Sequence, residues 1–488
     1  MPKPIFVAGR WREGRGETIA SHFPADGSLN AEVAGASAED VAEAVEAGRR
    51  AMADPAWRDL RPHERARHLH AISDGLSRRA DEIARVQTRD TGKTLAETRA
   101  LVASAAGTFR FFAAALETLE EELTPPRGDV LTMSIHEPIG VVGAITPWNS
   151  PIASDAQKVA PALAAGNAVV LKPAAWSPLV CLKLAEVVEE AGLPPGLFSA
   201  LPGSGAVVGD ALVRHPDVAK VSFTGGTSTG RSIARIAADK LMPVSLELGG
   251  KSPNIVFSDA DLDEALAGAL YGIFSSSGQS CIAGSRLFVQ RPVYDAFLGR
   301  LVEATRRLRV GHPEHDGTQV APLIHPRHRD AVDRYVRLAV EEGGEVLCGG
   351  RPPEGPAYEG GSYYLPTVIA GLGNGARVCQ EEIFGPVVVV LPFDDEDGLV
   401  AEANDSVYGL AAGIWSSDYR RIWRVARRLR TGTVWINTYK QFSISTPFGG
   451  VKESGLGREK GRHGIRAYMN QKSLYWNLGD RPLPWAGL

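Results

Sequence analysis

Hydrophobic positions in the first third of the chain recur with the spacing of amphipathic helices. Leu69, Ile72 and Leu76 follow one another at intervals of three and four residues, which places them on one helical face. Ser37 precedes a similar run and is a residue type that caps helices. We therefore expect this third to be mainly helical, with an interruption at residues 90–92.

From residue 141 onward, short runs rich in β-branched residues alternate with segments of helical spacing. The predicted strands are residues 141–146, 168–171, 198–201, 220–224 and 243–248. The predicted helices between them are residues 151–165, 177–191, 207–213 and 228–238. Strands joined through helices form a parallel, doubly wound sheet with helices on both faces. The fold class is therefore predicted to be α/β.

A second alternating block follows the first. Its predicted strands are residues 255–257, 287–289, 387–391, 412–415 and 432–437, and its predicted helices are residues 262–274 and 293–308. This block predicts a second doubly wound parallel-sheet domain, with a cleft between the two domains. The glycine-rich stretch at residues 347–361 indicates a surface loop.

Composition narrows the function classes. The 488 residues are 44% hydrophobic and 23% charged, which is typical of a globular protein with a large core. Lys and Arg number 53 against 57 Asp and Glu, so no basic excess favours nucleic acid or a membrane surface as a partner. Four scattered cysteines indicate neither a disulfide framework nor a metal site. The first apolar run ends at Gly9, which is too early for a signal peptide, so we expect a cytoplasmic protein.

Polar residues stand just beyond the ends of predicted strands, where the ligands of an open parallel sheet collect. They are Asn149, Lys172, the turn at residues 224–226, and Glu247. The turn opens a helix, and its free N–H groups suit an anion such as pyrophosphate, although such turns are more often packing devices. Glu247 lies in a strand expected to be covered on both faces, and burial would raise its pKa to a value that suits a general base.

Cys281 lies in a loop of small residues, 277–284, where backbone N–H groups can approach its sulfur. Such groups stabilise a thiolate and an adjacent oxyanion, so Cys281 is a candidate nucleophile. An inert buried thiol is the commoner role of cysteine and is the alternative interpretation. We expect that role for Cys181, Cys348 and Cys379.

Seven short motifs are distributed over nearly the whole chain. They are residues 145–151 (ITPWNSP), 171–174 (LKPA), 223–227 (FTGGT), 246–251 (LELGGK), 278–281 (GQSC), 381–386 (EEIFGP) and 447–450 (PFGG). In this order they resemble the motifs of the aldehyde dehydrogenase superfamily. Any one motif would be weak support, but seven in sequence are highly specific.

The resemblance implies a role for each matching residue. Cys281 would be the nucleophile, Asn149 the side-chain donor to the oxyanion, and Glu247 the base that activates water. The residues implied to bind the cofactor are Thr146, Pro147, Trp148, Lys172, Gly225, Gly226, Glu382 and Phe384. The implied reaction forms a thiohemiacetal on Cys281, transfers hydride to NAD or NADP, and hydrolyses the resulting thioester to a carboxylic acid.

One position departs from the family pattern in a way that bears on the coenzyme. Many NAD-preferring members carry Glu three residues after the lysine that corresponds to Lys172, and Ala175 stands there in this chain. A carboxylate at that position would repel the 2′-phosphate of NADP, so its loss removes a means of discrimination. No Arg in this segment is present to bind a 2′-phosphate instead. We therefore expect NAD or NADP as cofactor, with a preference for NAD.

The implied substrate tunnel also departs from the pattern. Ser150, Ser154 and Gln157 share one helical face where relatives often place bulky apolar residues. The residues expected to line the tunnel are Ser150, Ser154, Phe274, Phe442 and Phe448. A polar or even cationic aldehyde is one hypothesis for the small-molecule substrate, and a helix edge that faces water is the alternative.

The resemblance also implies a domain organisation. A dinucleotide-binding domain would comprise residues 1–124 and 146–248, and a catalytic domain residues 249–446. Residues 125–145 and 447–488 would form an oligomerisation arm and a C-terminal segment, because a strand-like tail near residues 473–476 has an exposed edge that needs a partner. A homodimer or homotetramer is expected.

Three alternatives to a non-acylating aldehyde dehydrogenase stay open. A coenzyme A-acylating semialdehyde dehydrogenase would not need a water base, so Glu247 argues against it. A thiol esterase would use Cys281 and Asn149 without redox chemistry. A crystallin-like structural protein on the same fold would not need any of these three residues.

Overall fold

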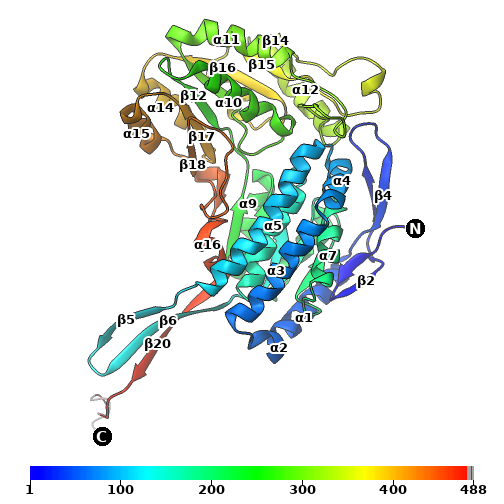
Figure 1. Ribbon diagram of the computed structural model, residues 1–488, viewed down its shortest axis with the longest axis vertical. Coiled ribbons are helices and arrows are strands. Elements are labelled where there is room, and N and C mark those ends of the chain that lie inside the picture. Colours follow the sequence, from blue (N-terminus) through cyan, green and yellow to red (C-terminus); the bar gives the residue numbers. More distant parts are fainter. Residues whose placement is uncertain (481–484, 486–488) are drawn as a thin grey trace.

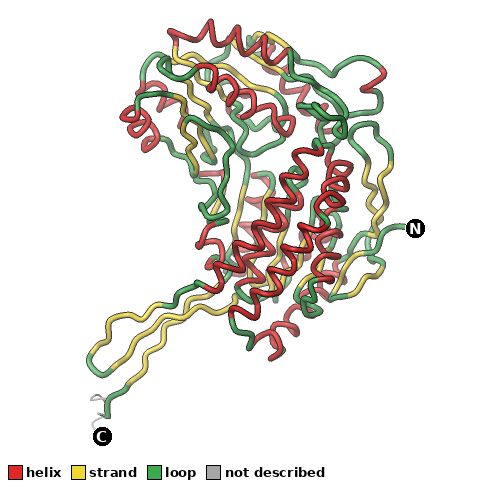
Figure 2. Tube along the Cα trace, viewed as in Figure 1, coloured by secondary structure: helices red, strands yellow, loops and turns green. Residues whose placement is uncertain are grey.

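The computed structural model describes residues 1–480 and 485, and these form two lobes and a projecting arm (Figure 1). One lobe contains an eight-stranded sheet and the other a seven-stranded sheet, while the arm contains three strands. Figure 2 shows helices and strands alternating in both lobes. The predicted α/β class with two parallel-sheet lobes is confirmed.

The eight-stranded sheet has the order β19-β11-β10-β7-β8-β9-β1-β2. Its strands are β1 (Ile5–Val7), β2 (Arg10–Arg12), β7 (Val141–Ile145), β8 (Ala168–Lys172), β9 (Phe198–Ala200), β10 (Val218–Thr224), β11 (Val244–Glu247) and β19 (Gly455–Leu456). The five from β7 to β11 run parallel, and the strands at both edges are antiparallel to their neighbours. The carboxyl ends of the parallel strands therefore meet at one edge of the sheet.

Helices cover both faces of this sheet. They are α1 (Ala38–Ala53), α2 (Pro55–Arg58), α3 (Pro62–Arg78), α4 (Ala80–Thr91), α5 (Leu95–Glu117), α6 (Pro151–Ala164), α7 (Val180–Glu190), α8 (Asp210–Arg214) and α9 (Thr227–Lys240). As predicted, Ser37 caps α1, where its hydroxyl accepts a hydrogen bond from the Asp40 N–H. The interruption at residue 92 is Gly92, which ends α4 in the left-handed conformation that glycine adopts without strain.

Within the described residues, α5 is the one helix that is long and apolar enough to cross a membrane. It packs against α3, α4 and α6, and its Phe109 and Phe112 side chains are buried in the core of the lobe. The apolar character of α5 is therefore explained by burial in the protein.

The seven-stranded sheet has the order β14-β15-β16-β13-β12-β17-β18. Its strands are β12 (Pro253–Val256), β13 (Arg286–Gln290), β14 (Glu345–Cys348), β15 (Thr367–Ala370), β16 (Val387–Phe393), β17 (Ala411–Trp415) and β18 (Thr433–Ile436). Its helices are α10 (Leu262–Phe274), α11 (Arg291–Arg306), α12 (Pro326–Glu341), α13 (Arg377–Gln380), α14 (Glu396–Asn404) and α15 (Tyr419–Arg428). All strands except β14 run parallel to their neighbours, as the sequence predicts for a second doubly wound unit.

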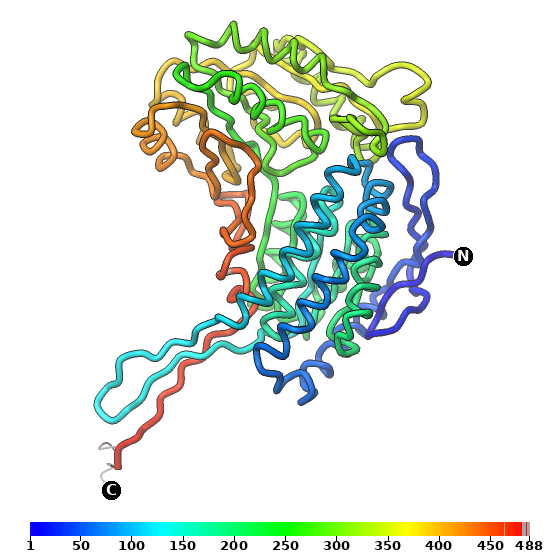
Figure 3. Tube along the Cα trace, in the orientation of Figure 1, coloured from blue at the N-terminus to red at the C-terminus, as the bar shows by residue number. Residues whose placement is uncertain are grey.

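The arm is a three-stranded antiparallel sheet of β5 (Glu122–Arg127), β6 (Val130–Pro138) and β20 (Met469–Asn477), and β20 follows the short helix α16 (Gly461–Arg466). Segments far apart in the sequence lie side by side in it, as the cyan and red strands in Figure 3 show. Tyr475 and Trp476 on β20 are exposed. The arm thus carries large apolar side chains away from both cores.

Three predictions need correction. The first third is not purely helical, because residues 5–34 form β1, β2 and a hairpin of β3 (Thr18–His22) and β4 (Leu29–Ala34), all short and without a regular alternation of buried and exposed positions. The predicted loop at residues 347–361 begins inside β14. The predicted arm range 125–145 is too long at its end, because β7 lies between β8 and β10 in the eight-stranded sheet.

Candidate active site and nucleotide crevice

A crevice of about 550 Å³ lies at the carboxyl ends of β7, β8 and β10. Six of the residues predicted to bind a cofactor line it: Thr146, Pro147, Trp148, Lys172, Gly225 and Gly226. They come together because each follows or ends a parallel strand at the same edge of the sheet. The crevice is mostly apolar in its lining, with polar groups at a few positions, as small-molecule sites are.

The glycine turn in the crevice fits a phosphate group. Gly226 is the N-cap of α9, and no side chain caps this helix end. A Cβ atom on Gly226 would meet open space, so the backbone is accessible there. The first N–H groups of a helix have no partner within the helix and attract anions. Lys172, whose pKa burial lowers to about 8, adds an ammonium group in the same crevice.

Glu382 and Phe384 come from the loop that precedes β16 in the other lobe. The carboxylate of Glu382 accepts a hydrogen bond from the Gly250 N–H at 3.0 Å, and burial raises the pKa of Glu382 to about 7. Phe384 has a left-handed backbone (φ +57°), and its ring lies 5.2 Å from that of Trp148, centroid to centroid. The loop therefore contacts the chain just beyond β11 and β7. Glu382 and Phe384 lie beside the crevice and are not part of its lining.

A second cavity, of about 380 Å³, contains the three predicted catalytic residues, Cys281, Asn149 and Glu247. Thr224 lines both this cavity and the crevice, so the two adjoin. Of the predicted tunnel residues, Ser150, Ser154, Phe442 and Phe448 line the cavity, and Gln157 does so as well. The prediction that Phe274 lines the cavity is wrong. Its side chain, at the end of α10, is buried in the apolar core of the seven-stranded sheet.

Cys281 follows a tightly folded loop of small residues. Ser276 and Ser277 adopt left-handed backbone angles, and a Cβ atom on Gly278 would lie 2.0 Å from the Gly385 carbonyl oxygen. Burial raises the pKa of Cys281 to about 12, and the nearby carboxyl groups of Glu382 and Glu247 add to this rise. The sequence led us to expect groups that favour the thiolate, whereas this environment keeps the resting thiol protonated.

The Asn149 side chain is held in place beside the cysteine loop. Its Nδ2 donates a hydrogen bond to the Gln279 carbonyl oxygen at 3.0 Å. Gln279 is fixed in turn, because its side-chain oxygen accepts from the Ile324 N–H at 2.9 Å. An amide nitrogen has two N–H donors, so one N–H of Asn149 remains for a ligand oxygen near Cys281.

Glu247 is buried, and its Oε2 atom has no hydrogen-bond partner among the described residues. Burial raises its pKa well above the ordinary value, and Glu459 raises it further. Glu459 itself forms a buried ion pair with Lys158 of α6, and the Lys158 ammonium also donates to Ser222 at 3.2 Å. A carboxyl group in this environment has a high proton affinity.

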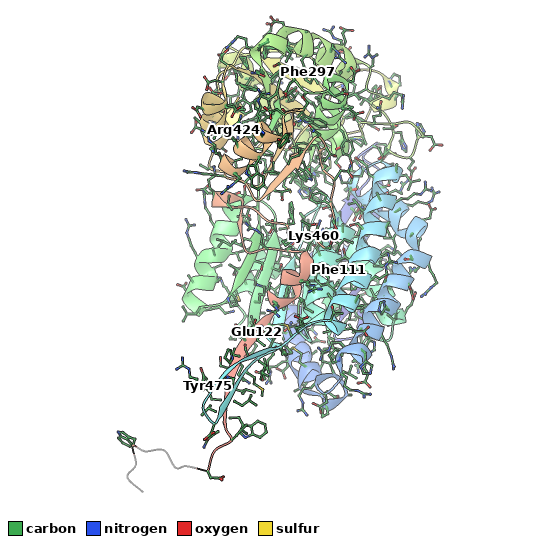
Figure 4. The ribbon with its side chains drawn as sticks, turned by 60° about the vertical axis from the view of Figure 1, so that its left-hand side comes forward. Phe111, Glu122, Phe297, Arg424, Lys460 and Tyr475 are labelled. Carbon is green, nitrogen blue, oxygen red and sulfur yellow. The ribbon has the colours of Figure 1, made fainter. Side chains whose placement is uncertain are left out.

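The sequence did not identify several polar residues of the cavity. Lys158, which lies behind the lining, gave one signal that could have been used, because it is the lone basic residue of a helix that is buried over most of its length. Glu459 and three further lysines of the lining, Lys93, Lys440 and Lys460, stand in segments without a recognisable motif. Figure 4 shows Lys460 between the two lobes, beside α16.

Comparisons with known proteins agree with this geometry. The family model described as "Aldehyde dehydrogenase family" matches residues 11–474. Betaine aldehyde dehydrogenases of Bacillus subtilis and Cereibacter sphaeroides are 41% and 44% identical, over 99% and 98% of both chains respectively. A crystal structure of a point mutant of the Staphylococcus aureus betaine aldehyde dehydrogenase, in complex with NAD+ and with a BME-modified cysteine, has a TM-score of 0.97 and 36% identity, and covers 99% of this chain and 98% of that one.

Proposed function

The chain belongs to the aldehyde dehydrogenase family and oxidises an aldehyde to a carboxylic acid with NAD(P)+, and we propose that Cys281, Asn149 and Glu247 carry out this reaction. The observation that carries the proposal is that one cavity contains a thiol, an amide donor and a carboxyl group of raised pKa. The same cavity adjoins the crevice at Thr224. Substrate and coenzyme can therefore meet at Cys281.

The first step is attack by sulfur. The Sγ atom of Cys281 forms a bond to the aldehyde carbon, and the carbonyl oxygen becomes an oxyanion. Because the thiol is protonated at rest, Cys281, which is partly exposed, releases its proton to solvent as the sulfur attacks. The free N–H of Asn149 and the backbone N–H of Cys281 then bind the oxyanion.

The second step removes hydride. NAD(P)+, when bound, accepts the hydride from the thiohemiacetal carbon. The chain contributes the site: α9 and the turn at Gly226 receive the pyrophosphate, Lys172 and Glu382 bind the two riboses, and the pair Trp148 and Phe384 borders the coenzyme. NAD is the proposed coenzyme, since a solved relative contains it.

The last step hydrolyses the thioester. Glu247, in its carboxylate form, takes a proton from a water molecule as that water attacks the thioester carbon, the C–S bond breaks, and the carboxylic acid leaves. Glu247 then gives this proton to the Cys281 thiolate, so the proton that the thiol first released to solvent is the net proton of the reaction. A base at this position is not needed for transfer to coenzyme A, and redox chemistry distinguishes the enzyme from a thiol esterase, so neither alternative is favoured.

A Glu247→Gln variant tests this sequence of steps. We expect a burst of NADH in the first turnover, followed by slow steady-state turnover, with an acyl adduct on Cys281 that mass spectrometry detects. The matched control is Glu264→Gln on the exposed face of α10, which should behave as wild type. An unchanged steady-state rate in Glu247→Gln would remove Glu247 from the mechanism, and absence of any adduct would remove the covalent intermediate.

The subunit assembly and the substrate are also proposed. β20 presents Leu474, Tyr475 and Trp476 to solvent at the end of the arm, and we propose that a second subunit covers them in a homodimer or homotetramer. Betaine aldehyde, which the names of the relatives contain, is one of the aldehydes to assay. A cytoplasmic location stays a prediction.

A further inference from the structure

Three lysines from separate parts of the chain border the cavity that contains Cys281. Lys93 lies between α4 and α5, Lys440 follows β18, and Lys460 precedes α16. Lys93 is only 4% exposed and Lys460 only 6%. Lysine is almost never buried so deeply without a partner, because an ammonium group loses favourable hydration when it leaves water.

The carboxyl groups of the cavity offset the charge of these lysines only in part. Burial lowers the pKa of Lys93 and that of Lys440, the latter to about 7, and the charge of Glu97 opposes this fall. Glu459 forms its ion pair with Lys158 instead. Over the described residues, the ammonium groups of Lys93 and Lys460 make no ion pair, and that of Lys440 donates to the Ser275 hydroxyl at 2.9 Å. An anion bound beside Lys93 and Lys440 would therefore stabilise their charged forms.

The aromatic residues of the cavity already face ammonium groups. The Nζ atom of Lys460 lies 4.1 Å from the ring centroid of Phe442 and 5.4 Å from that of Phe448. The Nζ atom of Lys440 lies 5.9 Å from the centroid of Tyr271. A cationic ligand binds over open aromatic faces. Here it would compete with lysines for those faces and would be repelled by their charge, which opposes the hypothesis of a cationic aldehyde.

The backbone holds two of these lysines in an uncommon conformation. Lys440 and Lys460 have φ values of +56° and +59°, in the left-handed region that non-glycine residues seldom adopt. Such residues persist where the surrounding structure fixes them, and they cluster at sites of function. The two ammonium groups are thus held against the cavity by the fold.

We propose that the physiological substrate is an aldehyde with a carboxylate at its far end, and that Lys440 and Lys93 bind this carboxylate. Lys460 adds to the positive field in which the substrate lies. The inference rests on the proposed function, because it assigns the substrate class of the same cavity. Hydrogen bonds from ammonium groups to a carboxylate are among the stronger ones in proteins, and the aldehyde end would remain free to reach Cys281.

The test compares three aldehydes with NAD+: 4-oxobutanoate, its methyl ester, and betaine aldehyde. We expect kcat/KM for 4-oxobutanoate to exceed that of the ester, which has the same chain without the charge, by about tenfold or more. Betaine aldehyde should be the poorest of the three. If the ester or betaine aldehyde equals or exceeds 4-oxobutanoate, the inference is wrong, whereas the proposed function fails only if no aldehyde reduces NAD(P)+.

Variants of the two lysines test whether they cause the preference for 4-oxobutanoate. Lys440→Met and Lys93→Met should each lower kcat/KM for 4-oxobutanoate about tenfold more than kcat/KM for the methyl ester, because the ester forms no ion pair with either lysine. Lys440→Arg should restore most of the affinity. The matched control is Lys3→Met, which removes an exposed lysine far from the cavity and should change neither substrate. An equal loss for acid and ester in both variants would assign these lysines a structural role and overturn the proposal.

Discussion

The nucleotide crevice and the aldehyde cavity meet at Thr224 but are built in different ways. The crevice is assembled at the ends of three neighbouring parallel strands, and among the described residues Lys172 is the one basic side chain in its lining. The cavity takes residues from seven separate segments, including buried lysines and glutamates. On the proposed assignment, a coenzyme that is common to a whole family would be bound by the regular part of the fold, and the residues that distinguish one aldehyde from another would lie where distant segments converge.

The largest expected effect is a loss of activity that leaves NAD+ binding unchanged. Cys281→Ala should abolish aldehyde oxidation, a loss of at least about 10⁴-fold, because the bond-forming sulfur is removed. NAD+ binding, measured by calorimetry, should stay within about twofold of wild type, since the crevice does not include this residue. Cys348→Ala, at the edge of the seven-stranded sheet, is the matched control and should retain full activity. Weak NAD+ binding in the Cys281 variant would show that crevice and cavity are not independent.

A smaller effect is expected within the cavity. Asn149→Ala removes one oxyanion donor and should lower kcat/KM by about 10² to 10³-fold. Coenzyme affinity should not change, although Asn149 directly follows the crevice residue Trp148. Asn477→Ala, in the exposed arm, controls for the loss of an asparagine. If the rate falls less than tenfold, the donors that stabilise the oxyanion lie elsewhere.

The same contrast explains which parts of the site could be predicted from the sequence. Lys172 and Gly226 directly follow predicted strands, so local pattern and one rule about parallel sheets were enough to bring them together. Glu247 was found at the end of a predicted strand and Cys281 in a loop of small residues, and the motifs then implied their roles. Lys158 and Glu459 are 301 positions apart, and only the complete topology makes them a pair. The lysines of the cavity are likewise single residues in irregular segments.

The fold shows a similar limit. The central strands β7 to β11 were predicted within a few residues, because they are apolar runs buried on both faces. The hairpin of β3 and β4 was not predicted, since its residues are exposed and buried without a regular alternation. The end of the arm was placed wrongly because β6 and β7 are separated by only two residues, and nothing local shows that the chain changes sheets there.

A substitution at the rim of the crevice should change the preference for NAD over NADP without affecting the cavity. Ala175 is partly exposed and follows β8 by three residues. Ala175→Glu should place a carboxylate near the adenosine ribose and repel a 2′-phosphate, which lowers kcat/KM with NADP relative to NAD about tenfold. Ala175→Gln, of equal size but neutral, should shift this ratio less. The ratio is measured with one aldehyde and both coenzymes, and equal shifts in the two variants would exclude an electrostatic cause.

The smallest expected effect is on the stability of the fold, and it concerns two adjacent residues of α6. Ser154 faces the cavity, whereas Asp155 is fully buried, and burial raises the pKa of Asp155 to about 7 from 3.8. A carboxyl group with a raised pKa stabilises the folded state below its unfolded pKa, and that contribution is lost as the pH rises through the folded pKa. Asp155→Asn cannot ionise, so its melting temperature should exceed that of wild type by about 1 to 3 °C at pH 8 and by less at pH 5. Ser154→Ala should show no such pH-dependent difference, and a difference that is equal at both pH values would mean that Asp155 does not titrate in this range.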